Sequence, residues 1–119
     1  MFELLPPVQA GGAWTEMVLY SFTGMADGEI PLAGLAMDRA GNLYGTTSEG
    51  GVAACNCGVV FKLARSSGGG WLESVPHTFT GGPDGSSPQA GVMLHNGALY
   101  GTTKQGGRAQ QGVVFTVVP

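Results

Sequence analysis

The sequence predicts an all-β protein of the β-propeller type, made of tandem four-stranded antiparallel meanders that amount to about two blades. A long internal repeat is the first observation behind this prediction. The second is the composition, with 22 glycines and few charged side chains among 119 residues. The third is that the apolar residues form short runs rich in Val, Leu, Tyr and Phe, separated by glycine-containing turns, as short strands do.

The internal repeat has a period of 56 to 57 residues. The sequence Leu-Tyr-Gly-Thr-Thr of residues 43–47 returns letter for letter at 99–103. The sequence Phe-Thr-Gly of residues 22–24 returns at 79–81, and Asp-Gly follows both copies at the same spacing. A period of this length marks a supersecondary unit that buries its apolar faces against copies of itself.

The complete unit between residues 32 and 79 contains four expected strands. They are placed at 32–38, 43–47, 58–63 and 71–79. The first is short and mostly apolar, which suits a strand buried on both faces, and the turn at 39–42 joins it to the second as a hairpin. Three consecutive glycines at 68–70 mark the turn before the fourth strand. Pro76 places that strand at a sheet edge, because proline cannot donate to a ladder.

Five further strands fill the rest of the chain. They are expected at about 2–5, 14–22, 89–95, 98–104 and 112–118. The chain is then a single repeat region, 1–119, and its blades follow from these strands. A partial blade is expected at 1–31, the full blade at 32–79 and an incomplete blade at 89–119.

Two blades cannot close a ring, because β-propellers contain about four to eight of them. The expectation is therefore that further blades complete the array, or that several copies of the chain assemble head to tail into a ring. The incomplete blade lacks an outer strand. Residues 14–22 of a neighbouring copy, or of the same chain folded back, could supply it.

Composition and charge argue against two classes of partner. The net charge is −3 and the five Lys and Arg residues are scattered along the chain, whereas nucleic-acid binding needs a clustered cationic face. No apolar run approaches the ~20 residues that span a bilayer. The N-terminal segment 1–7 has no basic region and no long apolar stretch, so it does not read as a secretion signal.

The repeated motifs resemble a bacterial tandem-repeat family called GloVer, the choice-of-anchor repeat proteins. The unit of that family reads approximately Gly-Asn-Leu-Tyr-Gly-Thr-Thr, a Gly-Gly loop, Gly-x-Val-Phe-Lys-Leu, a Gly-rich turn with Trp, then Tyr-x-Phe-x-Gly, Asp-Gly and Pro. The matching positions here are 41–47, 50–51, 58–63, 68–71, Phe79, Gly81, Asp84, Gly85 and Pro88. The second copy departs with Gly-Ala at 97–98 and Thr-Val at 116–117.

This resemblance implies an exported, extracellular or cell-surface protein with a propeller-like fold and no assigned activity. The family pattern also includes an export signal and a C-terminal anchor, and neither is recognised within this sequence. Localisation outside the cell is thus an expectation that rests on the resemblance alone.

Aromatic residues recur at equivalent positions and are candidates for ligand binding. They are Tyr44 with Tyr100, and Trp14 with Trp71. An aromatic ring packs well against the apolar face of a sugar, so one platform per blade could bind a carbohydrate. The alternative is that each ring fills the gap between two blades, which the glycines beside the tyrosines favour, since glycine allows close backbone approach.

Repeated carboxylates are weaker candidates. Asp27 and Asp84 precede glycine in equivalent loops and could ligate Ca²⁺. A calcium loop supplies several carboxylates in close succession, however, so an Asp-Gly turn is the favoured interpretation. Glu16 and Glu73 could form a glycosidase pair, but they lie on expected outer strands, where a solvated charge blunts a sheet edge. No catalytic residue, metal or other cofactor is predicted.

Cysteine and histidine offer no complete catalytic or metal set. Cys55 and Cys57 have one residue between them and no counterpart in the second copy. They could form a local disulfide, pair between chains in an oxidising compartment, or stay free. A zinc site would need further ligands close in sequence. His77 and His95 occupy non-equivalent positions, and no serine in a nucleophile-elbow sequence accompanies them.

The predicted function is that of a non-catalytic binding or display scaffold outside the cell, whose loops contact a glycan or another protein. The alternative is a fragment of a propeller enzyme, a hydrolase or lyase whose catalytic residues lie in other blades. Propellers host both classes, so the fold alone does not choose. The expected innermost strands offer only Asp38 and His95 as ionisable side chains near a central channel, which favours binding.

Overall fold

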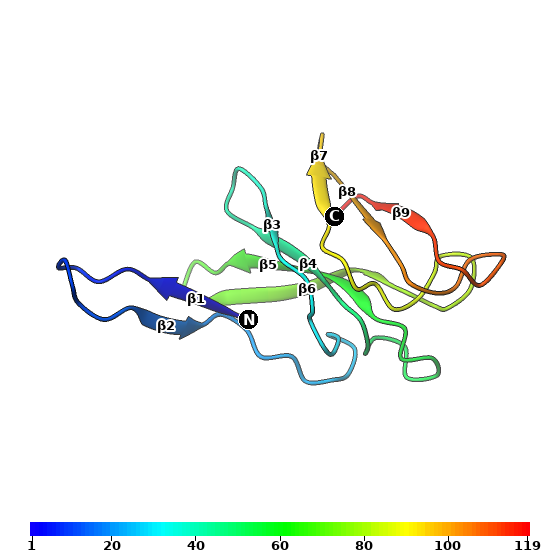
Figure 1. Cartoon of the computed structure of the whole chain (residues 1–119), viewed down its shortest axis with the longest axis horizontal. Coiled ribbons are helices and arrows are strands. Elements are labelled where there is room, and N and C mark those ends of the chain that lie inside the picture. The colour runs from blue at the N-terminus through cyan, green and yellow to red at the C-terminus, as the bar shows by residue number, and fades with distance from the viewer.

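The computed structural model describes all residues, 1–119, and contains nine strands and no helix (Figure 1). The strands are β1 (Phe2–Leu5), β2 (Thr15–Val18), β3 (Ala36–Met37), β4 (Leu43–Thr47), β5 (Val59–Arg65), β6 (Trp71–Thr78), β7 (Met93–His95), β8 (Ala98–Thr102) and β9 (Val114–Val117). Each lies where the repeat pattern predicts a strand. The all-β prediction is confirmed.

The strands form three separate antiparallel sheets in chain order. The sheets are β1-β2, β3-β4-β5-β6 and β7-β8-β9. The four-stranded sheet is the predicted meander, and β6, which contains Pro76, lies at its edge as expected. The ladder between β5 and β6 shifts register between Val60 and Lys62, at the level of the proline. A bulge there is consistent with a residue that has no N–H to donate.

The two inner hairpins differ in their turns, which explains why the repeat loses one residue between its motifs. Asp38 N donates to Asn42 O at 3.0 Å, and Gly41 within this turn has a φ of 83°. The second hairpin is tighter, because Asn96 and Gly97 alone connect β7 to β8, with φ of 48° and 79°. Positive φ at both positions is the geometry of a two-residue type I′ turn, for which Asn-Gly is the preferred sequence.

Aromatic side chains fill the space between successive sheets. Phe79, which follows β6, packs edge-on against Phe115 of β9, and Phe22, which follows β2, packs in the same way against Phe61 of β5. Phe61 and Phe79 are 1% and 0% exposed. A Cβ at Gly45 of β4 would collide with the ring of Phe61. Gly45, beside Tyr44, therefore makes room for the packed ring of Phe61.

Backbone hydrogen bonds join each sheet to the next at a junction that occurs twice. The segment that follows each outer strand pairs with the loop after the second strand of the next sheet. Glu29 N donates to Glu49 O at 2.8 Å, and Ser86 N donates to Gln105 O at 2.8 Å. The reverse bonds from Glu49 N and Gln105 N are 3.1 Å long in both junctions. The repeat in the sequence is therefore also a repeat of the hydrogen bonds between sheets.

The innermost strands are more exposed than the sequence predicts. Burial on both faces is expected for 32–38, yet only Ala36–Met37 is regular strand, and Leu32 and Met37 are 60% and 67% exposed. That expectation is wrong for this chain. The physical reason is that β7 lies beside β3, whereas Leu35 and Met37 line an open cavity with Phe2 of β1 in place of packing closely against that strand.

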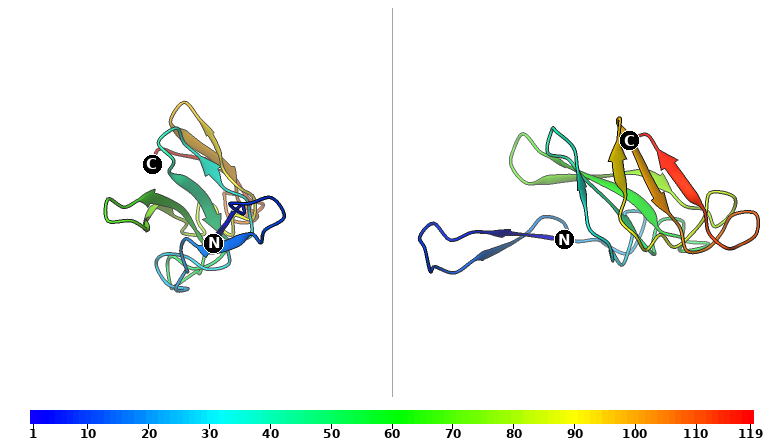
Figure 2. Two further views of the ribbon diagram at one scale, coloured as in Figure 1. Left: turned by 90° about the vertical axis from the view of Figure 1, so that its left-hand side faces the viewer. Right: turned by 45° about the horizontal axis from the view of Figure 1, so that its top comes forward.

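The molecule is elongated, and its two ends are different. It measures 54 × 30 × 29 Å. The β1–β2 hairpin projects from one end, and the β7-β8-β9 sheet lies toward the other (Figures 1 and 2). Because β2 pairs with β1, the expectation that 14–22 could fold back onto the incomplete sheet of its own chain is wrong. A membrane-spanning helix is absent from the structure.

Candidate functional site

The repeated aspartates, Asp27 and Asp84, accept hydrogen bonds that hold the loops in which they lie. Asp27 accepts hydrogen bonds from Thr23 N at 2.8 Å, Thr23 Oγ1 at 2.6 Å and Tyr20 OH at 3.0 Å. Asp84 accepts from Thr80 N at 3.0 Å and lies 3.3 Å from His77 Nε2. Burial opposes the charged form of both carboxyls, but these hydrogen bonds outweigh it and lower the pKa of each. Both side chains have the contacts of an Asp-Gly turn.

The structure places the four candidate aromatics in different environments. Tyr44 is 3% exposed and its hydroxyl donates to Asp38 Oδ2 at 3.0 Å, so its ring contacts protein rather than solvent. Tyr100 is 39% exposed and Trp14 is 62% exposed. Trp71 is half-buried, with the Arg65 guanidinium 4.4 Å from its ring. No cavity of the molecule is lined by two of them.

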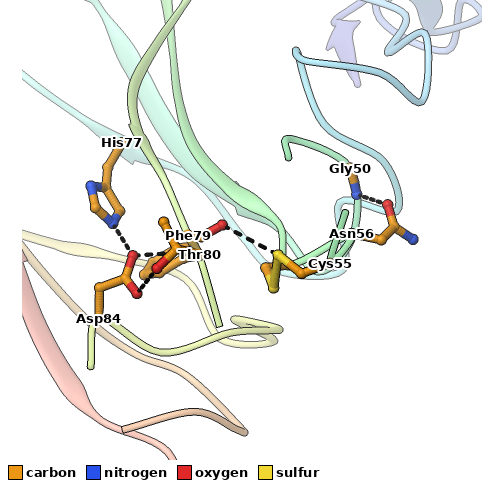
Figure 3. The surroundings of a disulfide bond; sticks show 8 residues. Gly50, Cys55, Asn56, His77, Phe79, Thr80 and Asp84 are labelled. Carbon is orange, nitrogen blue, oxygen red and sulfur yellow. Dashed lines mark hydrogen bonds and ion pairs between the residues drawn. A yellow bond between two sulfur atoms is a disulfide. The ribbon is translucent and has the colours of Figure 1, made fainter. Parts of the chain in front are cut away.

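The two cysteines form a disulfide within one loop (Figure 3). Their Cα atoms are 5.2 Å apart. Cys57 is 4% exposed, and its carbonyl accepts a hydrogen bond of 2.8 Å from Ser87 N across the junction to the next sheet. Asn56 between them has a φ of 53° and accepts a 2.6 Å bond from Gly50 N. The disulfide therefore stabilises a loop that contacts the next repeat.

The two glutamates stay on outer strands, Glu16 on β2 and Glu73 on β6. They belong to separate sheets, and no hydrogen bond or cavity joins them. Glu73 is half-buried, and its Oε1 has no hydrogen-bond partner. Burial, together with the charge of Asp27, raises the pKa of Glu73.

One polar groove gathers side chains from two repeats. It lies between the β3–β4 turn and the β7–β8 turn and has a volume of about 510 Å³. It is lined by Asp38, Arg39, Leu94, His95, Asn96 and Gly97. The turns meet because β3 and β7 lie side by side. This is the site at which the structure brings together Asp38 and His95.

Hydrogen bonds fix the carboxylate of the groove. Asp38 Oδ1 accepts from Ala40 N and Asn42 N, both at 2.9 Å. Its Oδ2 accepts from Asn42 Nδ2 at 2.8 Å and from Tyr44 OH at 3.0 Å. The side-chain bond from Asn42 is the main cause that lowers the pKa of Asp38. The carboxylate therefore stays ionised and holds the turn.

The other polar groups of the groove have hydrogen-bonding capacity to spare. Arg39 forms no ion pair, and the side chain of Asn96 bonds only to His95 Nε2, at 3.1 Å. A guanidinium carries five donors and an amide both donors and an acceptor. From the sequence, Asp38 and His95 are expected on the innermost strands, whereas Arg39 and Asn96 are identified only by the structure. The signal that could have found them is that equivalent turns of adjacent repeats must be neighbours.

Metal binding has no support from side-chain geometry, since no group of three or more His, Cys, Asp or Glu side chains could hold an ion.

Comparison with known proteins gives one match. A family model described as the Gloeobacter/Verrucomicrobia repeat matches residues 2–119. No curated protein and no solved structure matches the chain.

Proposed function

Because the chain belongs to the Gloeobacter/Verrucomicrobia repeat family, we propose that it is a non-catalytic repeat segment that acts outside the cell as a binding scaffold. Its ligand is a glycan, held in the polar groove between the two inner hairpin turns. The observation that carries this proposal is that equivalent turns of adjacent repeats line one groove with side chains of different chemistry. In an array of such repeats, each pair of adjacent inner turns would form a groove of this kind.

The size and polarity of the groove favour a saccharide. A volume of about 510 Å³ lies in the range of ordinary ligand pockets. Arg39 offers donors, and the Asn96 amide offers both donors and an acceptor to sugar hydroxyls, which are themselves donors and acceptors. Leu94 supplies an apolar surface for a ring face.

The ionised state of the Asp38 carboxyl favours binding over catalysis. A general acid needs a pKa near the working pH, whereas the hydrogen bonds to Asp38 lower its pKa. The hydrogen bonds that the Asp38 carboxylate accepts come from the turn residues Ala40 and Asn42 and from the Tyr44 hydroxyl.

A location outside the cell is supported by the disulfide between Cys55 and Cys57. Disulfides persist in oxidising compartments and are rare in the cytosol.

The test is a binding measurement on a panel of soluble oligosaccharides by isothermal titration calorimetry. Arg39→Ala is expected to weaken binding by roughly tenfold or more, because a hydrogen bond to a charged group contributes about 1.5–3 kcal/mol. Arg108→Ala, at an exposed arginine outside the groove, is the control for the loss of one positive charge. Absence of binding to every saccharide would contradict the proposal. So would binding that survives Arg39→Ala and is lost in Trp14→Ala, because the ligand would then stack on the exposed indole.

A further inference from the structure

The single carboxylate of the polar groove has no acceptor capacity left for a ligand. Asp38 is the one acidic residue among the six that line the groove. Its two oxygens accept four hydrogen bonds, from Ala40 N, Asn42 N, Asn42 Nδ2 and Tyr44 OH. A carboxylate offers about four lone-pair sites, so a sugar hydroxyl finds no free site on Asp38 to which it can donate. The groups that the groove offers to a ligand therefore come from its other side chains.

Arg39 brings a positive charge without a protein partner to the same groove. Its side chain is exposed, and the one ion pair of the structure joins His77 to Asp84. A guanidinium presents its N–H donors in a planar fork that fits both oxygens of a carboxylate. The group that best satisfies Arg39 is therefore an anion with two acceptor oxygens.

His95 adds a second free donor from the neighbouring turn, which lies beside the turn of Arg39 (Figure 2). Asn96 Nδ2 lies 3.1 Å from His95 Nε2. An amide nitrogen only donates, so Nε2 accepts this hydrogen bond, and the proton of the neutral imidazole is then on Nδ1. The Nδ1–H group has no acceptor within the protein. Among the side chains of the groove, free N–H donors therefore outnumber free acceptors, since Asn96 Oδ1 is the one acceptor without a partner.

We propose that the groove selects an acidic saccharide, one whose sugar ring carries a carboxylate, and that this carboxylate binds the Arg39 guanidinium. The inference rests on the proposed function, because it names the class of glycan that the same groove binds. His95 Nδ1–H donates to an oxygen of the sugar, and the half-buried Leu94 contacts the apolar face of the ring. A uronic acid combines all of these groups in a single ring.

The charge of Asp38 does not cancel this preference. Two of the hydrogen bonds that it accepts come from backbone N–H groups, which hold the carboxylate against its own turn. Asp38 and Arg39 are not paired, so the guanidinium is free to turn toward a ligand. A sugar carboxylate then forms charge-assisted hydrogen bonds with Arg39 directly, whereas solvent and salt screen its repulsion from Asp38 in the open groove.

The first experiment is isothermal titration calorimetry with pairs of ligands that differ in charge. Oligogalacturonate and oligomannuronate are each compared with their methyl esters, which keep the rings and linkages but carry no negative charge. Each acid is expected to bind roughly tenfold or more tightly than its ester, because a hydrogen bond between charged partners is about twice as strong as one between neutral groups.

The outcomes separate this inference from the proposed function. Esters that bind as tightly as the acids, or binding to neutral saccharides alone, would overturn the selection of an acidic sugar and leave glycan binding in place. Absence of binding to every acid, ester and neutral saccharide would contradict both.

The second experiment changes Arg39 itself. Arg39→Gln is expected to abolish the preference for acid over ester, and Arg39→Lys to keep only part of it, because an ammonium lacks the planar fork. Arg108→Gln is the matched control, at an exposed arginine outside the groove. Arg65→Gln tests another cation, which stacks on Trp71 and lines a different cavity. A preference that survives Arg39→Gln, or that is lost in Arg65→Gln instead, would overturn the proposal.

Discussion

Phe79 meets Phe115 edge-on with ring centroids 5.0 Å apart, and Phe22 meets Phe61 at the same 5.0 Å. Each pair joins the segment after an outer strand to the third strand of the next sheet. The two interfaces between sheets therefore have the same aromatic contact at their centres, and edge-to-face pairs of this kind add to the stability gained from burial alone.

Phe79→Ala is expected to lower the free energy of unfolding by about 3–5 kcal/mol, as for other fully buried aromatic residues. Phe22→Ala is expected to cost less, because Phe22 is only half-buried. Urea denaturation followed by tryptophan fluorescence measures both. Leu72→Ala on the exposed face of β6 is the control, and a loss there as large as in Phe79→Ala would argue against a central role for this contact.

Gly50→Ala is expected to destabilise the chain much more than Gly69→Ala. The two glycines have similar φ angles, 81° and 86°, so the backbone strain of about 1–2 kcal/mol is common to both. A Cβ at Gly50 would lie 2.5 Å from the Cα of Gly28 in the junction, whereas nothing lies within 4 Å of a Cβ at Gly69. The difference between the melting temperatures of the two variants measures the effect of the collision, because the backbone strain is common to both. Equal temperatures would show that the junction can open to admit a methyl group.

Stability is expected to fall as the pH rises between about 10 and 12. Burial, followed by the hydrogen bond to Asp27, raises the pKa of Tyr20 from 10.0 to about 12. A group whose pKa is raised on folding contributes stability that is complete below the unfolded pKa and is lost as the pH rises through the folded pKa. Tyr20→Phe should flatten this part of the curve of unfolding free energy against pH. Tyr100→Phe, where the hydroxyl forms no hydrogen bond, serves as the control, and an unchanged slope in Tyr20→Phe would contradict the assignment.

Reduction of the disulfide is expected to lower the free energy of unfolding by about 1–2 kcal/mol, because the loop closed by Cys55 and Cys57 is very short. Denaturation with and without dithiothreitol measures the difference. A Cys55→Ala/Cys57→Ala variant should not respond to the reductant. Hydrogen exchange at the Ser87 amide, which donates to Cys57 O, should become faster on reduction, and unchanged exchange there would mean that the loop keeps its shape without the bond.

The sequence predicted the strands well because both local signals and the repeat placed them. The Leu-Tyr-Gly-Thr-Thr motif is strand in both copies, as β4 and β8, and Pro76 lies on the edge strand that its missing N–H requires. The GloVer resemblance is confirmed by the family match over residues 2–119. These features depend on residues close in the chain or on a period that can be read directly.

Burial and the groove could not be predicted in the same way, because both depend on neighbours. Met37 is apolar and yet 67% exposed, since an apolar strand is buried only where another sheet covers it. Arg39 and Asn96 are ordinary turn residues until two turns stand side by side. The propeller arrangement and the ligand stay predictions, and the binding measurements above test the ligand.

The duplicated junction has an evolutionary consequence. When the junctions between repeats share the same central pair of backbone bonds, recombination that adds or deletes one whole period of the gene creates a junction of a kind already present. Arrays of this kind can therefore lengthen or shorten without inventing a new interface.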